Sequence, residues 1–198
     1  MTDREPADDG TPSGDPTVEG SERLVANAEV HRNAWERTLE DLRATEGELE
    51  DEGWDVVATA AGHTGPVAPE HDKGYWGLSY VLPESGAREA EDAVEDAAFP
   101  AYEVYRNTVQ GRVFAVVSYL DPDAETAVLV ASNFRLRDAT DLVAHAHDVG
   151  HLNSVLRRLD GTVIARIRHD EPGKFFPRYD SFERYRDDWH EQFLDDSP

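Results

Sequence analysis

Apolar residues recur with helical spacing near the start of the chain. One series, which includes a histidine, repeats at steps of three or four residues: Leu24, Ala28, His31, Trp35, Leu39 and Leu42. This spacing places side chains on one face of an α-helix. The pattern therefore predicts an amphipathic helix over residues 22–51, with Ser21 as its N-cap and Gly53 at its end.

The remaining chain alternates between strand-like and helix-like segments. Runs rich in β-branched and aromatic residues predict strands at 54–60, 75–82, 101–109, 112–120, 126–133 and 162–169. Helices are expected at 85–98, 138–159 and 181–193, with Gly150 as a point of interruption in the second. Segment 61–74 is rich in Gly, Pro and His, so we expect an irregular loop there.

This order of elements predicts the α+β class. We expect a mainly antiparallel sheet of about five to six strands packed with amphipathic helices and flanked by N- and C-terminal helices. Between residues 75 and 169 the order is loosely βαββαβ-like with one extra strand.

The first twenty residues differ in composition from the rest of the chain. They contain three Pro, three Gly, six acidic residues and one large aliphatic residue, Val18. This composition predicts a disordered acidic tail over 1–20, followed by a single domain over 21–198. With neither a secretory signal pattern nor a run of about 20 apolar residues, we expect no membrane contact and a cytoplasmic location.

Acidic residues outnumber basic ones by 42 to 19, which gives a formal net charge of −23. Only two of the basic residues are lysines, Lys73 and Lys174. This composition resembles that of proteins from haloarchaea. The absence of cysteine excludes disulfides, cysteine-ligated metals and a thiol nucleophile.

The charge also predicts a dependence of stability on salt. A charge of this size destabilises the compact state by self-repulsion, and at 1 M salt the Debye length of about 3 Å screens most of it. We predict a higher thermal midpoint in molar KCl than in dilute buffer. Equal midpoints in the two solutions would contradict this.

The charge is unevenly distributed along the sequence. Residues 1–99 contain 25 acidic and 7 basic residues, whereas residues 100–186 contain 12 of each. The neutral second half favours burial, internal ion pairs or an interface, including one between copies of this chain. Nucleic acid is an unlikely partner because no basic stripe offsets the overall field.

A histidine-rich segment, HAHDVGH at 145–151, is the strongest candidate for metal chemistry. His147 and His151 are four residues apart and share a face of the expected helix, so with Asp148 they are candidate ligands for Zn or Mn. The string HDVGH resembles the motif of the HD-domain metal phosphohydrolases, in which an adjacent His and Asp ligate the metal. That family is an all-helical bundle, whereas strands precede the motif here. The alternative is a solvated helix surface.

Two further groups of residues are candidate ligand contacts. His71 and Trp76 belong to a long loop and the start of the next strand, where they would form either a ligand lid or a flexible surface excursion. Arg166 and Arg168 share a face of the last expected strand and, with Lys174, would form an anion-binding patch. The alternative for these arginines is cross-strand pairing with acidic residues.

Four strings, GYWGLSYVLP, YEVYR, LDGT and FFPRY, resemble small acidic haloarchaeal proteins of families of unknown function. The resemblance covers residues 21–185 and implies a single domain without supplying an activity. We therefore predict a non-enzymatic binding, regulatory or oligomerisation domain of a salt-adapted organism, and expect no cofactor. The alternative is a divalent-metal-dependent hydrolase that uses His147, Asp148 and His151.

Overall fold

The computed structural model describes residues 16–71 and 73–185, with side chains between residues 26 and 182 except those of His71 and Asp96. Its α-helices are α1 (Pro16–Asp51), α2 (Glu84–Asp96) and α3 (Thr140–Val149). Its strands are β1 (Asp55–Ala60), β2 (His63–Val67), β3 (Gly77–Val81), β4 (Ala101–Val109), β5 (Arg112–Asp121), β6 (Thr126–Arg135), β7 (Leu152–Arg157) and β8 (Val163–His169). Short 3-10 turns are η1 (Pro69–His71), η2 (Leu136–Ala139), η3 (Pro172–Lys174) and η4 (Tyr179–Tyr185).

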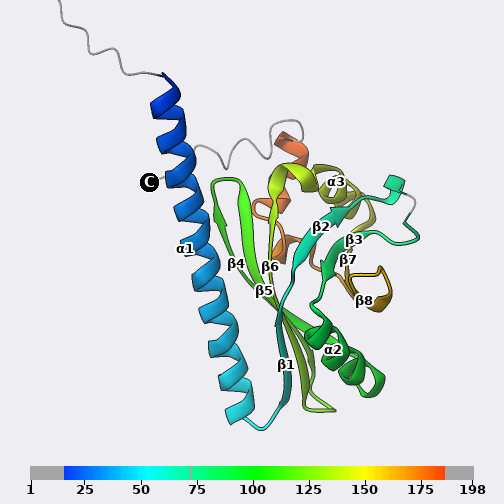
Figure 1. The fold of residues 1–198 in the computed structure, drawn as a ribbon. Helices are drawn as coiled ribbons and strands as arrows, with labels where there is room; N and C mark the ends of the chain where they lie inside the picture. The colour runs from blue at the N-terminus through cyan, green and yellow to red at the C-terminus, as the bar shows by residue number, and fades with distance from the viewer. Residues whose placement is uncertain (1–15, 72, 186–198) are drawn as a thin grey trace, which may run out of the picture.

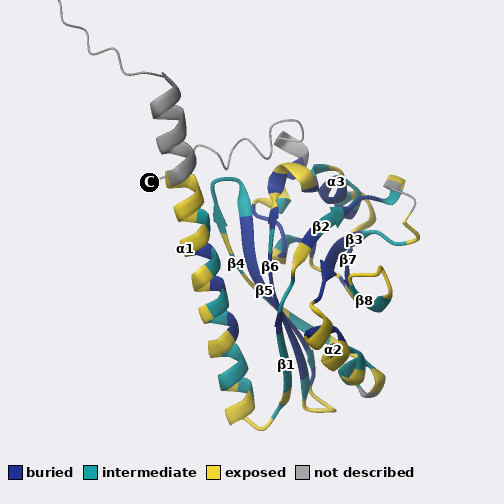
Figure 2. Ribbon diagram, viewed as in Figure 1, coloured by how far each residue is buried: buried dark blue, intermediate teal, exposed yellow. Residues whose placement is uncertain are grey.

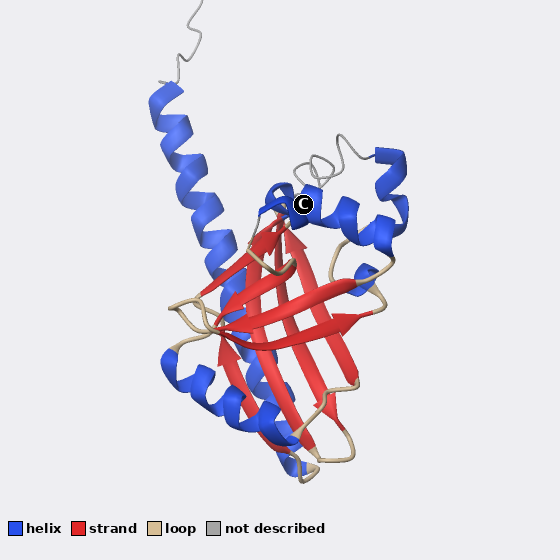
Figure 3. Ribbon diagram, turned by 90° about the vertical axis from the view of Figure 1, so that its right-hand side faces the viewer, coloured by secondary structure: helices blue, strands red, loops and turns tan. Residues whose placement is uncertain are grey.

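The strands form two four-stranded sheets that cross each other (Figure 3). Sheet A has the order β1-β6-β5-β4, and sheet B has the order β2-β3-β7-β8. Both sheets are mixed, because β1 pairs with β6 in parallel and β3 pairs with β7 in parallel. The prediction of a single, mainly antiparallel, βαββαβ-like sheet of five to six strands was wrong.

Two errors in the sequence interpretation account for this difference. Segment 61–74, expected to be an irregular loop, contains β2, a strand that tolerates Pro66 because it pairs on one side only, with β3. The helix expected over 138–159 ends at Val149, where Gly150 adopts a left-handed conformation with φ 72°. Its second half is the strand β7.

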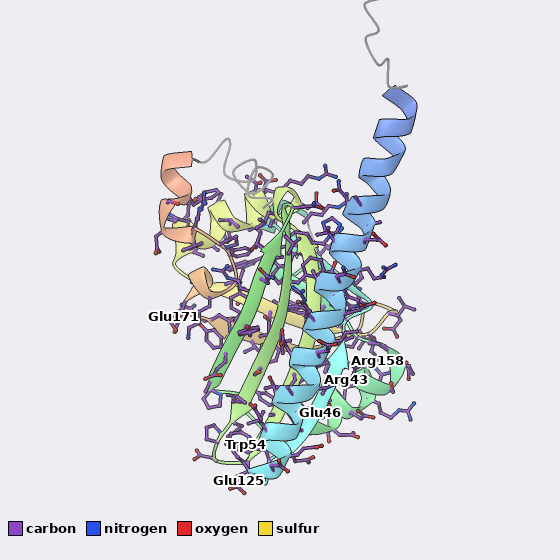
Figure 4. All side chains as sticks on the ribbon, turned by 90° about the vertical axis from the view of Figure 1, so that its left-hand side faces the viewer. Arg43, Glu46, Trp54, Glu125, Arg158 and Glu171 are labelled. Atoms are coloured by element: carbon purple, nitrogen blue, oxygen red, sulfur yellow. The ribbon has the colours of Figure 1, made fainter. Side chains whose placement is uncertain are left out.

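Helix α1 lies along the outer face of sheet A (Figures 1 and 4). Its apolar stripe of Trp35, Leu39 and Leu42 packs on a row of small and branched residues from β5 and β6: Val116, Ala127, Leu129 and Ala131. The charged side chains Arg43 and Glu46 project from the same helix (Figure 4). The predicted helix is confirmed, and it starts earlier than expected, at Pro16, within the segment interpreted as tail.

The main core lies between the two sheets, where the strands are most deeply buried (Figure 2). Residues on the inner face of sheet A include Val113, Val117, Tyr119, Val128 and Val130. They meet the inner face of sheet B, represented by Leu78, Tyr80, Leu152 and Leu156. Helices α2 and α3 contribute Ala87, Ala90, Leu142 and Ala146 to the same core.

A buried histidine closes one end of this core. His169, the last residue of β8, has no exposed surface, and its Nε2 lies 2.8 Å from the hydroxyl oxygen of Ser154. The rings of Tyr102, Phe175 and Tyr119 surround it at centroid distances of 4.3, 4.7 and 5.8 Å. Burial lowers the pKa of His169 to about 4, so the imidazole is neutral at neutral pH.

Hydrogen bonds from one arginine connect segment 173–176, which follows β8, to sheet A. Arg106 of β4 donates from Nε to the carbonyl of Lys174 at 2.9 Å, and from Nη2 to the carbonyls of Gly173 and Phe176 at 3.4 and 3.3 Å. Burial lowers the pKa of Arg106. These bonds hold Phe175 and Phe176 over the core, so this arginine has a structural role.

Candidate functional site

The chain changes sheet at residues 61 and 62, and β2 and β6 diverge from that point, which we call the fork (Figure 1). The Ala61 amide donates to the carbonyl of Ala131 in sheet A at 2.9 Å, and the next amide, of Gly62, donates to the carbonyl of Val81 in sheet B at 2.9 Å. Strand β6 continues beyond Ala131 to Arg135, paired with β5 alone. The edge of β6 that pairs with β1 up to Ala131 is therefore not paired with β1 from there to Arg135.

A pocket of about 290 Å³ occupies this fork. Its walls come from the sheet-changing segment, the ends of β5 and β6, and η2: Ala61, Gly62, His63, Thr64, Arg112, Asn133, Phe134, Arg135 and Asp138. Asn133 and Arg135 follow Leu129 and Ala131 on alternate positions of β6, so they lie on the α1 side of sheet A. We call this cavity the arginine pocket.

Two arginines face each other across the strands that line the pocket. Arg112 of β5 is directly opposite Arg135 of β6 in the antiparallel register. Like charges at opposed positions destabilise a sheet. Among the residues that the structure describes, no carboxylate forms an ion pair with either guanidinium. Asp138 in the pocket wall pairs with Arg137 at 3.5 Å, and its charge offsets only part of the effect of Arg135 on Arg112. The pocket therefore concentrates positive charge in a strongly acidic protein.

The electrostatic effect of this pair is visible on neighbouring groups. Burial and then the charge of Arg135 lower the pKa of Arg112 below its usual value, while the charge of Asp138 acts in the opposite direction. Burial, followed by the charge of Arg112, also lowers the pKa of His31 on α1, whose ring lies 6.1 Å from that of Phe114. The Nε2 of His31 has no hydrogen-bond partner among the described residues.

Polar groups of the pocket wall hold the Arg112 guanidinium in place and supply further hydrogen-bonding atoms. Nη1 of Arg112 donates to Oδ1 of Asn133, which fixes the guanidinium at the pocket wall. Thr64 is buried, and its hydroxyl lacks a partner within the described residues. The exposed His63 lies over Gly65, where a Cβ would stand 3.1 Å from the His63 Nε2. This set of donors is suited to an anion such as a carboxylate or a phosphate.

The predicted metal ligands do not converge. The ring of His147 lies 5.5 Å from that of Tyr179 and 6.2 Å from that of Phe182. His151, beyond the end of α3, lies 4.9 Å from the ring of Trp76. Asp148 is exposed at the end of α3. Within the described ranges, no group of three His, Asp or Glu residues is placed to hold a metal ion.

Trp76, predicted as a ligand contact, lies against two histidines of the segment 145–151. Its ring lies 4.5 Å from that of His145 in an edge-on arrangement and also touches His151. Trp76 is half-buried and packs on the main core. His71 is the last residue of η1, and its side chain lies outside the described part of the structure.

The predicted anion patch is divided among separate contacts. Arg168 pairs with Asp170 at 3.0 Å, and Lys174 pairs with Glu171 at 2.6 Å. The guanidinium of Arg166 lies 6.0 Å from the ring centre of Tyr75, on the outer face of sheet B. Both ion pairs join residues two or three positions apart in the sequence, so they are not the cross-strand pairs expected as the alternative.

Sequence reasoning missed the arginine pocket, although one signal for it was present. The hairpin between β5 and β6 pairs Asp121 with Thr126, and this register places Arg112 opposite Arg135. Counting outward from the turn would have identified the opposed arginines. The fork itself depends on β2, which the sequence did not indicate.

The fold and the pocket define a two-sheet α+β domain with an arginine-lined cavity where its sheets diverge. The chain belongs to the family of unknown function DUF7529, whose model matches residues 21–177. This match confirms the expectation of a domain of unknown function. No curated protein and no solved structure matches the chain. In the part of the chain that the structure describes, no helix combines the length and apolarity that a membrane span requires.

Proposed function

We propose that this protein is a binding domain for a small anionic ligand, held in the arginine pocket by Arg112 and Arg135. The observation that carries the proposal is the register pairing of these two arginines without a carboxylate partner in the described residues. Elsewhere in the domain, basic side chains such as Arg158, Arg168 and Lys174 have acidic partners. Asp138 in the pocket wall is a single carboxylate for two arginines, and an anion bound between the two guanidinium groups would add the second negative charge.

The pocket also has the size and polarity that such a ligand needs. About 290 Å³ is sufficient for a phosphate or carboxylate group with a small substituent. The hydroxyl of buried Thr64, which has no partner among the residues described, and the ring of His63 add hydrogen-bonding groups at the wall. The overall charge of −23 repels anions at long range, so binding depends on these short-range contacts.

The test is binding of inorganic phosphate and of acetate, by calorimetry and thermal shift, with KCl balancing the ionic strength. We predict that phosphate raises the melting temperature of the wild type. Arg112→Gln and Arg135→Gln should each weaken phosphate binding by about 10- to 100-fold, because each removes a charge-assisted hydrogen bond of about 1.5 to 3 kcal/mol. Without ligand, Arg135→Gln should be more stable than wild type by about 0.5 kcal/mol, because it removes a like-charge opposition.

Arg43→Gln is the matched control, since it removes the same charge from an exposed position on α1 outside the pocket. It should leave phosphate affinity within about twofold of the wild type, apart from a small change in the overall field. Equal losses in Arg43→Gln and Arg135→Gln would mean that only net charge matters, and the proposed site would be wrong.

The composition supports a second part of the proposal, that the domain works in the cytoplasm of a salt-adapted organism. The excess of acidic over basic residues, 42 to 19, and the near absence of lysine are the supporting observations. The salt-dependent melting predicted above tests this part independently of the ligand.

A further inference from the structure

A second cavity, of about 500 Å³, adjoins the arginine pocket. The two share Gly62 and His63, the segment where the chain changes sheet. The wall of the second cavity is mainly apolar, and comes from the end of β3, the start of α2 and the β7–β8 turn: Gly62, His63, Val81, Leu82, Pro83, Glu84, Arg157 and Leu159. We call it the apolar cavity.

The register of sheet B places the two cavities side by side. His63 of β2 is opposite Val81 of β3, which is in turn opposite Arg157 of β7. A molecule that extends from the arginine pocket past His63 therefore meets the side chain of Val81 next. The cavity wall is mainly polar on the arginine-pocket side of His63 and mainly apolar on the other side.

The outer wall of the apolar cavity is an exposed leucine on an ordered turn. Leu159 is 85% exposed, the largest exposure among the large hydrophobic residues described. The β7–β8 turn that carries it is closed by a hydrogen bond from the Arg158 amide to the Thr162 carbonyl at 2.8 Å. A single exposed leucine is common on protein surfaces, and what makes Leu159 a candidate ligand contact is its position in the wall of the apolar cavity.

Arg158 holds this turn against α2 (Figure 4). Its Nε donates to Oε1 of Glu91 at 2.8 Å, its Nη2 donates to Oε2 of the same residue, and its Nη1 donates to Glu84 at 3.1 Å. Two parallel bonds to one carboxylate restrict both distance and orientation. The position of Leu159 relative to Val81 and Leu82 is therefore fixed by the fold.

We infer that the natural ligand is an amphiphilic anion, whose carboxylate or phosphate head binds in the arginine pocket and whose apolar chain lies in the apolar cavity against Val81, Leu82 and Leu159. This inference rests on the proposed function, because the head group is the anion of that proposal. It adds the chemical class of the ligand: a hydrocarbon or aryl chain joined to a single acidic group.

The experiment measures affinity along two series of straight-chain ligands, alkanoates from acetate to decanoate and alkyl phosphates of the same lengths, all below their micelle concentrations. Each methylene buried in the apolar cavity should tighten binding about fourfold, the equivalent of about 0.8 kcal/mol. Comparing the two series identifies the preferred head group. Alcohols of equal chain length should bind at least tenfold more weakly than the acids.

Leu159→Asp is the diagnostic variant, because this exposed side chain is not part of either core. We expect it to flatten the dependence on chain length while phosphate affinity stays within twofold of the wild type. Val149→Asp, a substitution at another exposed aliphatic residue outside both cavities, should keep the full dependence. Circular dichroism of each variant verifies folding.

The outcomes separate this inference from the proposed function. Phosphate that binds in an Arg112-dependent way without any gain from longer chains would overturn the inference and leave the proposed function intact. Alcohols that bind as tightly as acids, unaffected by Arg112→Gln, would also overturn the inference. If neither phosphate nor any acid binds, both proposals fail.

Discussion

Gly77→Ala should lower the free energy of unfolding by about 3 to 5 kcal/mol, which for a chain of this size is a fall of about 10 °C in melting temperature. A Cβ at this position would lie 2.0 Å from the carbonyl oxygen of Asn153 and 2.7 Å from its carbonyl carbon. Both atoms are backbone atoms of β7, so they cannot move aside without disturbing the parallel β3–β7 pair. Gly77 also has φ 130°, which L-residues rarely adopt.

Gly74→Ala separates the effect of the clash with β7 from the effect of a positive φ. Gly74 also has a positive φ, 69°, but a Cβ there would meet no atom within 4 Å. The free energy of unfolding of this variant should fall only by the strain of the left-handed conformation, about 1 to 2 kcal/mol. Urea unfolding of both variants and the wild type gives the comparison. If the two variants differ by less than about 1 kcal/mol, the close approach of β3 and β7 is not present in solution.

The sequence predicted the elements whose pattern has a single interpretation. The series from Trp35 to Leu42 fits a helix, and it does not alternate as a strand would. The meander of β4, β5 and β6 was also predicted, with strand boundaries within two residues of those observed. The turns at Gln110–Gly111 and at Asp121–Glu125 account for this, because both are formed by local interactions such as the Asp123 amide donating to Oδ1 of Asp121.

The errors occurred where the spacing of apolar residues fits both a helix and a strand, or where pairing with another strand determines the structure. In β7, Leu152 and Leu156 are four residues apart, which fits a helix, but both also belong to the even-numbered positions that face the core with Ser154. Gly65 and Pro66 lower the strand propensity of β2, and its pairing with β3 compensates. Without β2 and β7, sheet B could not be recognised.

The candidate site was missed for a related reason. The opposed pair of Arg112 and Arg135 follows from a local hairpin, but a pocket forms beside it only because β1 ends at Ala60 and the chain continues in sheet B as β2. A crossing between sheets is a long-range property that hydrophobic spacing does not encode. By contrast, HAHDVGH is conspicuous in the sequence, yet Gly150 ends the helix and directs His151 toward Trp76.

The stability of the protein should fall by about 3 kcal/mol between pH 7 and pH 4 through His169 alone. The pKa of this buried imidazole is lowered from 6.5 to about 4, so the unfolded chain binds its proton at a higher pH than the folded protein does. Stability is therefore fully present above pH 6.5 and decreases as the pH falls toward 4. Asp170, the adjacent acid, acts in the opposite direction and reduces the shift.

His169→Gln is the variant that tests this dependence. Glutamine can keep a hydrogen bond to Ser154 but has no titratable group, so the variant should be less stable than the wild type at pH 7 and should show a shallower decrease between pH 6.5 and 4. Carboxylates with lowered pKa, such as Asp121 and Glu91, also destabilise the fold in acid, but they titrate in both proteins and cancel in the difference. Denaturant unfolding across this pH range at constant ionic strength measures both slopes. Parallel curves would mean that burial beside Ser154 of β7 does not lower the pKa of His169, and that the folded and unfolded chains bind this proton at the same pH.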